Sequence, residues 1–194
     1  MHVSGDPRLV GILLAAGRGR RFDPSGARKK LLQVLPSGEL VVAASARVLL
    51  SELARVVAVV RPGDDDVAAV LREAGCEVVV CADADDGMAL SLGAALRASM
   101  PALGWIVALG DMPFIQSSTV LALATALHQG ATIAAPVVDG RRGNPVAFAA
   151  ALLPELLALS GDEGARRLFQ IHPFTAVATT DAGILRDIDL PADL

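Results

Sequence analysis

Short apolar runs alternate with segments of helical periodicity along most of this chain, and this alternation constrains the fold more than any other feature. The runs rich in β-prone residues cover 9–15, 56–60, 77–81, 105–109 and 132–138. Between them, apolar residues recur at helical spacing over 41–53, 65–74, 89–99 and 119–129. A strand that is apolar along its length must be covered on both faces. The pattern therefore predicts βαβ units, with a mostly parallel sheet between two helical layers.

The helix ends and the remainder of the chain favour one α/β domain. Residues 64–66 and 117–119 offer side-chain oxygens for N-caps, while Gly75 and Gly130 stand where helices would stop. The less regular remainder predicts a short strand at 146–148 and helices at 150–159 and 165–171. Because no internal repeat or linker separates a second unit, we expect residues 1–194 to form a single three-layer α/β/α domain.

Composition and charge exclude several functional classes. Charged, Gly or Pro residues interrupt every apolar stretch before it reaches the roughly 18 residues that a membrane-spanning helix needs. The formal net charge is −4 and the clustered basic residues are confined to 18–30, so no nucleic-acid surface is expected. Residues 1–8 lack the pattern of a secretion signal, and Cys76 and Cys81 lie too far apart along one strand to form a disulfide. We expect a cytoplasmic protein that binds a small anionic ligand.

A glycine-rich basic turn follows the first apolar run and is the strongest chemical signal in the sequence. It comprises Leu14, Ala15, Ala16, Gly17, Arg18, Gly19, Arg20 and Arg21. Glycines in such a turn let backbone N–H groups approach phosphate oxygens, and arginines supply the countercharge. The spacing fits neither a dinucleotide-binding fingerprint nor a P-loop. The alternative, a solvated turn between strand and helix, is disfavoured by the basic residues from Arg18 to Lys30 in an acidic chain.

A carboxylate follows the fourth apolar run, in the segment Gly110-Asp111-Met112-Pro113. Ligands of parallel sheets bind beyond the carboxyl ends of the strands, so Asp111 is expected at the same edge as the glycine turn. Mg²⁺ prefers carboxylate oxygens together with substrate phosphates, which makes Asp111 a candidate metal ligand. The alternative is an Asp that only caps a turn before the next helix.

Gly87 and Ser91 open the helix that follows the third run. Free N–H groups and the Ser91 hydroxyl at this position could recognise a base or a ribose. The neighbouring Met88 and Leu92 are expected to pack in the core.

These segments, in this order, resemble the MobA/MocA-like nucleotidyltransferases of molybdenum-cofactor maturation, a branch of the NTP transferases. The resemblance extends to 143–146, 161–166 and 187–194, and so spans almost the whole chain. It implies a Rossmann-like nucleotidyltransferase fold and a Mg²⁺-dependent enzyme that moves a nucleoside monophosphate from an NTP to a phosphorylated acceptor, releasing pyrophosphate. By the same resemblance the acceptor is molybdopterin, and the product would pass to a molybdoenzyme or its chaperone.

The resemblance also implies roles for individual residues. The catalytic residues would be Lys30, Arg21 and Asp111, with Lys30 preferred to Lys29 because it stands just before a Leu-Leu pair. The nucleotide-binding residues would be Leu14, Ala15, Ala16, Gly17, Arg18, Gly19, Arg20, Gly87, Ser91 and Gly110. The metal ligands would be Asp111 and Asp189, with Asp187 as the alternative to Asp189. The acceptor contacts would be Asp162 and Asn144, which stands where the family often has His.

The nucleotide and the acceptor leave alternatives open. The Ala15-Ala16 pair and the segment 110–114 are similar to the cytidylyl branch, whereas guanylyl members tend to carry Ala-Gly-Gly in the first motif. CTP is therefore the preferred nucleotide and GTP the alternative. Two other interpretations are a sugar- or polyol-phosphate nucleotidyltransferase and a non-catalytic nucleotide-binding module that delivers cofactor to a partner. The presence of both Lys30 and Asp111 argues against the last.

Overall fold

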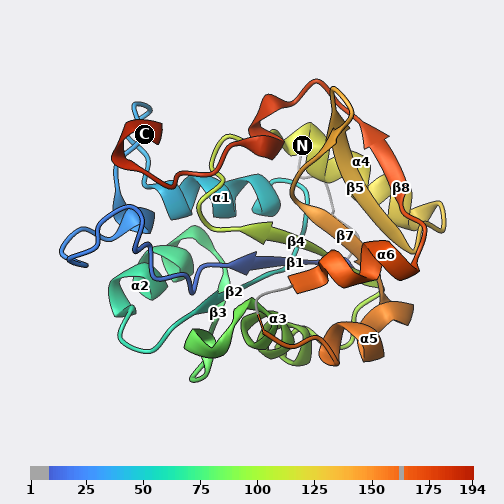
Figure 1. Ribbon diagram of the computed structural model, residues 1–194, viewed down its shortest axis with the longest axis horizontal. Helices are drawn as coiled ribbons and strands as arrows, with labels where there is room; N and C mark the ends of the chain where they lie inside the picture. Colours follow the sequence, from blue (N-terminus) through green and yellow to red (C-terminus); the bar gives the residue numbers. More distant parts are fainter. Residues whose placement is uncertain (1–8, 162–163) are drawn as a thin grey trace.

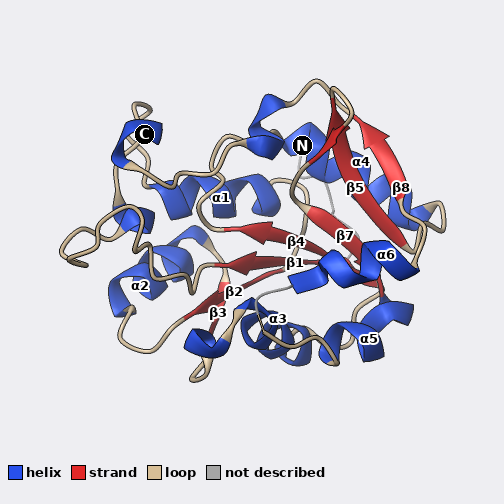
Figure 2. Ribbon diagram, viewed as in Figure 1, coloured by secondary structure: helices blue, strands red, loops and turns tan. Residues whose placement is uncertain are grey.

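The computed structural model describes residues 9–161 and 164–194. A sheet runs through the middle of the molecule, and helices lie on either side of it (Figure 1, Figure 2). The strands are β1 (Leu9–Leu14), β2 (Val56–Val60), β3 (Glu77–Val80), β4 (Gly104–Leu109), β5 (Ile133–Val138), β6 (Arg141–Arg142), β7 (Val146–Ala149) and β8 (Thr175–Ala178). The helices are α1 (Val41–Leu50), α2 (Asp65–Ala74), α3 (Met88–Ala98), α4 (Ser117–His128), α5 (Leu153–Leu157) and α6 (Leu168–Ile171). Among the described residues, none of the helices combines the length and the apolar character that crossing a membrane requires.

The order of the strands places a switch point between β1 and β4. The sheet has the order β3-β2-β1-β4-β7-β5-β6, with β8 beside β5. The pairs of β1 with β2 and β4, of β2 with β3 and of β5 with β8 are parallel, whereas β7 runs antiparallel between β4 and β5. The chain moves outward from β1 to β3 and then returns to the other side of β1 as β4. In open α/β sheets, such a switch point opens a crevice at the carboxyl ends of the strands.

Helices cover both faces of the sheet, which explains why the central strands are apolar along their length. All five residues of β2 are buried, as are the first five of β1. The helices α1, α2 and α4 pack on one face against residues such as Leu13 and Ile106. The helices α3, α5 and α6 pack on the other face against residues such as Ile12 and Trp105. Alternate residues of each strand thus serve two layers. The predicted α/β/α fold with a mostly parallel sheet is confirmed.

The irregular last third differs from the sequence-based prediction. The sequence-based prediction lacks β8, a strand of only four residues that are exposed or partly buried. The helix predicted at 150–159 divides into a 3-10 turn, Ala150–Leu152, and α5. Pro154 lies at the start of α5 and has no N–H to continue a helix from the preceding turn. The helix predicted at 165–171 shortens to α6, after a 3-10 turn.

The predicted helix caps are partly wrong. In neither α2 nor α4 does the side chain of the N-cap residue accept a hydrogen bond from the backbone N–H groups of the helix. Ion pairs with Lys29 occupy Asp64 and Asp66, and α4 is capped instead by the distant Asp181. The predicted stops are confirmed, because Gly75 and Gly130 adopt positive φ angles of 105° and 94° at the helix ends.

Candidate active site

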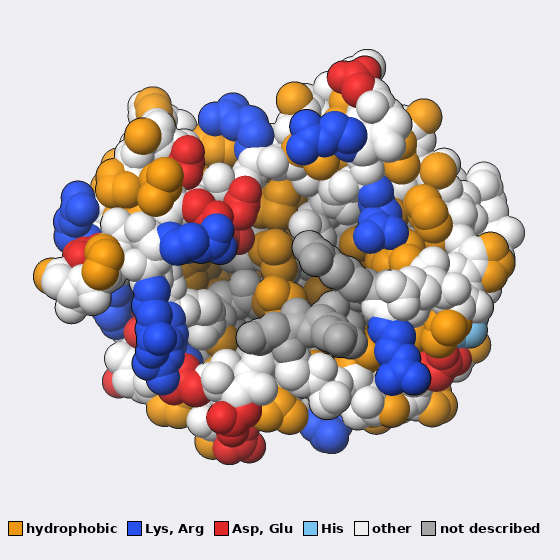
Figure 3. Space-filling model, in the orientation of Figure 1, with side chains coloured by type: hydrophobic (Ala, Val, Ile, Leu, Met, Phe, Trp, Pro, Cys, Tyr) orange, Lys and Arg blue, Asp and Glu red, His pale blue; other side chains and the backbone are white. Residues whose placement is uncertain are grey.

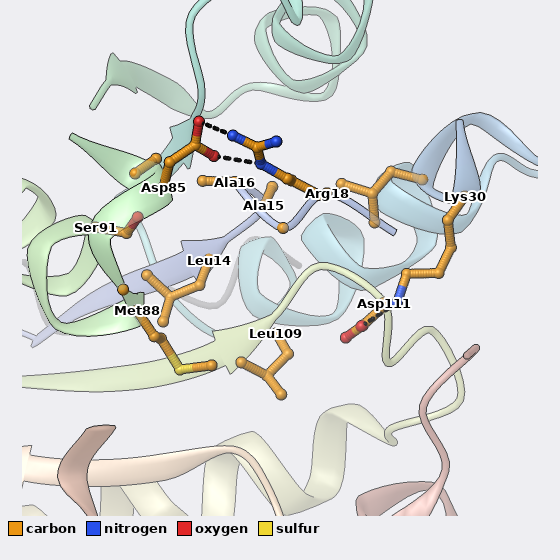
Figure 4. Close-up of a pocket in the computed structure, with 14 residues that line it drawn as sticks. Leu14, Ala15, Ala16, Arg18, Lys30, Asp85, Met88, Ser91, Leu109 and Asp111 are labelled. Carbon is orange, nitrogen blue, oxygen red and sulfur yellow. Dashed lines mark hydrogen bonds and ion pairs between the residues drawn. The ribbon is translucent and has the colours of Figure 1, made fainter. Parts of the chain in front are cut away.

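A cavity of about 270 Å³ opens at the carboxyl ends of β1 and β4, at the switch point of the sheet. Its walls come from the glycine turn after β1, the 3-10 turn Lys30–Leu32, the start of α3 and the loop after β4. Figure 4 shows two ion pairs on different sides of it, Arg18 with Asp85 and Lys30 with Asp111. The predicted nucleotide-binding residues that line this cavity are Leu14, Ala15, Ala16, Gly17, Arg18, Gly87 and Ser91.

Lys30 joins two carboxylates that come from distant parts of the chain. Its Nζ lies 2.7 Å from Asp111 Oδ2 and 3.5 Å from Asp189 Oδ1. The Lys30 side chain is 11% exposed and each carboxylate side chain is 22% exposed, so water screens these charges less than it would on an open surface. Lys29 points to other partners, Asp64 and Asp66. The structure therefore brings Lys30, and not Lys29, to Asp111.

The C-terminal segment places Asp189 next to Lys30 and Asp111. The Ile188 N–H donates to the Asp111 carbonyl oxygen at 2.9 Å, and the Ile188 side chain is fully buried. The carboxylate of Asp193 accepts the N–H groups of Leu190 and Asp189, which lowers the Asp193 pKa and holds the turn that follows Asp189. Backbone hydrogen bonds on both sides thus fix the position of Asp189.

The two candidate metal ligands of the C-terminal segment differ in their contacts, and so do the arginines of the turn. Asp189 contacts Lys30, whereas Asp187 is exposed. Arg21 forms an ion pair with Asp189 and so lies beside the cluster. Arg20 is exposed and lies outside the wall of the cavity.

Asp181 anchors the C-terminal strap, which we define as residues 181–194, to α4. This carboxylate is only 1% exposed and accepts hydrogen bonds from the Gln116 N–H, the Thr119 hydroxyl and the Gly183 N–H. Any Cβ at Gly183 would collide with the Phe114 carbonyl. The strap is therefore held at its start by a buried carboxylate and a close backbone contact, and it carries Asp189 at its far end.

The first turn of α3 forms another wall of the cavity. Gly87 adopts φ 125° and ψ 159°, and a Cβ there would lie 2.6 Å from the Gly161 carbonyl group. Ser91 is buried and lines the cavity. Met88 was expected in the core, but it is 44% exposed and lines the cavity, because α3 begins at the opening and its first residue faces outward. Leu92, one turn further, is buried as expected.

Sequence reasoning missed Asp85, which lies in the short turn before α3. Its Oδ1 accepts hydrogen bonds from Arg18 Nε at 2.7 Å and from Arg61 Nη2 at 2.5 Å. The Arg18 guanidinium, more than Arg61, holds the pKa of the Asp85 carboxyl below its ordinary value. The sequence offers no signal for this role, because Asp83, Asp85 and Asp86 look equivalent until the fold shows which of them meets the arginines.

Other predicted site residues lie beside the cavity rather than in its wall. Gly19 lines a smaller neighbouring cavity. Gly110 donates its N–H to the Leu14 carbonyl at 2.9 Å, and a Cβ there would lie 3.2 Å from that oxygen, so this glycine allows β1 and β4 to end close together. Asn144 stands two residues before Val146, which pairs with Val107 of β4, and therefore lies toward the same edge of the sheet. Asp162 falls outside the described residues.

Comparison with known proteins assigns this chain to a family. A model of the MobA-like NTP transferase domain matches residues 11–178. The chain belongs to this family. Members are nucleotidyltransferases, and an NTP substrate is consistent with this family. The matched range includes the glycine turn, Lys30 and Asp111 but ends before Asp189.

Individual relatives agree with the family assignment. Purine catabolism protein PucB of Bacillus subtilis (strain 168) is 30% identical over 203 residues, which cover 96% of this chain and 94% of PucB. The crystal structure of Rv0371c from Mycobacterium tuberculosis H37Rv has a TM-score of 0.81 at 26% identity and covers 96% of this chain and 95% of that protein. A nucleotidyl transferase from Methanothermobacter, Mth528, also has a TM-score of 0.81, at 25% identity over 97% of this chain and 94% of its own.

Proposed function

We propose that this chain is a Mg²⁺-dependent enzyme that moves CMP from CTP onto the terminal phosphate of a molybdopterin-type acceptor. The observation that carries the proposal is the meeting of Lys30, Asp111 and Asp189 at a cavity whose wall includes the glycine turn. Two anionic phosphates must approach each other in such a reaction, so the protein has to position them and neutralise their charge. A cation beside two candidate metal ligands, next to a turn suited to phosphates, meets that requirement.

The donor set of Asp111 and Asp189 fits Mg²⁺. Both carboxylates approach the Lys30 ammonium, at 2.7 Å and 3.5 Å, so they lie close enough to share one cation. Within the described part of the chain, no group of three or more His, Cys, Asp or Glu residues could hold a metal ion. Mg²⁺ tolerates so few protein ligands, because it completes its shell with water and substrate phosphates. When bound, it would neutralise charge on the phosphate oxygens.

The side chains of the cluster would then act on the charges of the reaction. An oxygen of the acceptor's terminal phosphate attacks the α-phosphorus of the NTP in line, and the bond from that phosphorus to the pyrophosphate oxygen breaks. The attacking monoester is already deprotonated, so no general base is needed. Lys30 would stabilise charge on the α-phosphoryl oxygens, and Arg21 would stabilise charge on the leaving pyrophosphate.

The choice of nucleotide and acceptor rests on smaller features. Ala15 and Ala16 are both buried and line the cavity, which supports a close approach of the nucleotide to the backbone. CTP follows from their similarity to the cytidylyl branch. Asn144 and Asp162 stay proposed acceptor contacts. The Bacillus relative is named for purine catabolism, and we extend that context to this chain. The molybdoenzyme that receives the finished cofactor would then act on purines.

A pyrophosphate-release assay across the four NTPs, with and without molybdopterin, tests the proposal. We expect release only with CTP, molybdopterin and Mg²⁺ together, with loss of activity after chelation and recovery after Mg²⁺ is restored. Turnover with GTP as the only active nucleotide would indicate a guanylyltransferase. Turnover with a sugar or polyol phosphate would change the acceptor class. NTP binding without release for any acceptor would indicate a non-catalytic delivery module.

A further inference from the structure

A second cavity, of about 150 Å³, adjoins the nucleotide cavity at the glycine turn. The two cavities share four lining residues, namely Gly17, Arg18, Lys30 and Leu31. The basic side chains around the second cavity are Arg18, Lys29, Lys30 and Arg61, and Asp64 is its one acidic lining residue. Each of these four cations is paired with a carboxylate, and beside a glycine turn they suit a compact, highly charged anion that takes the place of those carboxylates.

We propose that Arg61 and Lys29 bind the β- and γ-phosphates of the NTP, and then the departing pyrophosphate, in this second cavity. The inference rests on the proposed function only in requiring that an NTP binds with its α-phosphate beside Lys30. Because Lys30 lines both cavities, a triphosphate that reaches it can continue from the first cavity into the second. Arg21 pairs with Asp189 and lines neither cavity, so a pyrophosphate in the second cavity needs cations in addition to Arg21.

Arg61 is held in place for this task by Asp85. The Arg61 side chain follows β2, is 19% exposed and donates from Nη2 to Asp85 Oδ1 at 2.5 Å. Arg18 donates to the same carboxylate, which therefore lies between two guanidinium groups. Carboxylate and phosphate present similar pairs of oxygens to a guanidinium. Asp85 thus acts as an internal anion that a triphosphate displaces from Arg61 and Arg18.

Lys29, which also lines the second cavity, is held in the same way by carboxylates. Its Nζ lies 2.9 Å from Asp64 Oδ1 and 2.6 Å from Asp66 Oδ1. These partners, Asp66 more than Asp64, raise the pKa of Lys29 and keep its ammonium charged. On the face shown in Figure 3, Lys and Arg side chains lie next to Asp and Glu side chains along the rim of a hollow. Cations that are already ordered by carboxylates lose less side-chain freedom when a phosphate replaces those partners.

Binding measurements that compare CTP, CMP and pyrophosphate isolate the β,γ end of the nucleotide. We expect Arg61→Ala to weaken binding of CTP and pyrophosphate about 10-fold, the scale of a lost charge-assisted contact, and to leave CMP binding unchanged. Asp85→Asn removes the competing charge and is expected to tighten CTP binding about threefold. Calorimetry on the full chain with Mg²⁺ gives these dissociation constants, and thermal unfolding checks that each variant is folded.

Arg55→Ala is the matched control. Arg55 stands just before β2 as Arg61 stands just after it, and it pairs with Glu77 at 2.8 Å at the opposite edge of the sheet. Its loss is expected to leave the binding of all three ligands unchanged. The inference is wrong if Arg61→Ala binds CTP as tightly as wild type does. It is also wrong if the substitution weakens CMP binding as much as it weakens CTP binding. Weaker CTP binding by Asp85→Asn would make Asp85 a structural clamp and overturn its role as an internal anion.

The same measurements separate failure of the inference from failure of the proposed function. If wild type binds no NTP at all, both fail. If wild type binds CTP and responds to Arg61→Ala as expected, but no pyrophosphate is released with molybdopterin, only the proposed function fails. If another NTP binds in place of CTP, the series is repeated with that nucleotide and its monophosphate, and the expected pattern is the same.

Discussion

The Lys30 ammonium lies 2.7 Å from the Asp111 carboxylate, although 81 positions separate the two residues in the chain. The contact joins the 3-10 turn Lys30–Leu32 to the loop after β4, at the switch point of the sheet. Asp189 approaches the same ammonium at 3.5 Å from the C-terminal strap. Three segments therefore converge on one partly buried group of charges, and each of them can be tested separately.

Removing either partner of the central pair is expected to abolish most of the activity. Lys30→Ala and Asp111→Ala should each lower kcat by about 100-fold or more, because charge stabilisation in the transition state is lost. Steady-state pyrophosphate release measures this effect, and thermal unfolding tests that the fold is kept. Arg47→Ala is the control, since Arg47 of α1 pairs with Glu39 and does not line the cavity. A near-normal kcat in both variants would show that Lys30 and Asp111 are not catalytic residues.

The two aspartates of the C-terminal strap are expected to differ in their response to metal. Asp189→Asn removes a candidate Mg²⁺ ligand and should raise the Mg²⁺ concentration for half-maximal activity about 10-fold. Asp187→Asn should leave that concentration unchanged, because Asp187 is exposed while Asp189 contacts Lys30. Mg²⁺ titration of both variants makes the comparison. Equal responses would show that Asp189 has no special role in holding metal.

Replacing each of two glycines of the cavity wall by alanine is expected to have different effects on stability and on KM for the NTP. At Gly17 a Cβ would meet nothing within 4 Å, so Gly17→Ala should keep the Tm while the new methyl group raises KM for the NTP. At Gly87 a Cβ would lie 2.6 Å from the Gly161 carbonyl group in a positive-φ conformation. Gly87→Ala should therefore cost about 1–3 kcal/mol of stability and also raise KM. Unchanged NTP affinity in Gly17→Ala would argue against phosphate contact at the turn.

Loss of Asp181 is expected to loosen the C-terminal strap. Asp181→Ala leaves the Gln116 N–H, the Thr119 hydroxyl and the Gly183 N–H without their acceptor in a buried site. At about 1–3 kcal/mol for a buried group left unpaired, a loss of at least about 2 kcal/mol in the free energy of unfolding is expected. Urea unfolding measures it. Because the strap carries Asp189, the variant should also need a higher Mg²⁺ concentration for half-maximal activity. An unchanged concentration would show that the strap does not position a metal ligand.

Cys76 should make the stability of the fold depend on pH in the alkaline range. Burial raises the pKa of the Cys76 thiol to about 11, while an unfolded thiol ionises near about 8.5. The folded pKa is the higher one, so this contribution to stability is complete below about pH 8.5 and is lost as pH rises toward 11. The loss is expected to reach about 2 kcal/mol at pH 10. Urea unfolding of wild type and Cys76→Ala at pH 7.5 and pH 10 tests this, because wild type should lose about 2 kcal/mol more than the variant.

The sequence by itself determined the layered architecture and the position of most of the cavity at the switch point of the sheet. The apolar runs predicted five strands, and these strands and the helices between them appear in the structure; β2 is buried along its whole length, whereas β3 at the edge is exposed or only partly buried. The rule that ligands bind beyond the carboxyl ends of parallel strands then placed the glycine turn and Asp111 at one edge. Short, half-exposed elements such as β8 gave no such signal, because their pairing partner rather than their own composition makes them strands.

Only the tertiary structure decided which charges meet. Nothing in the local sequence distinguishes Asp85 from Asp83, or Asp189 from Asp187, since each is one acid in an acidic segment. The choice depends on where β2, the turn before α3 and the C-terminal strap end relative to the glycine turn. Electrostatic partners are set by distances of a few ångströms between segments that are remote in sequence, such as the 159 positions between Lys30 and Asp189. Burial can be predicted from neighbouring residues, but ion pairing of this kind needs the folded chain.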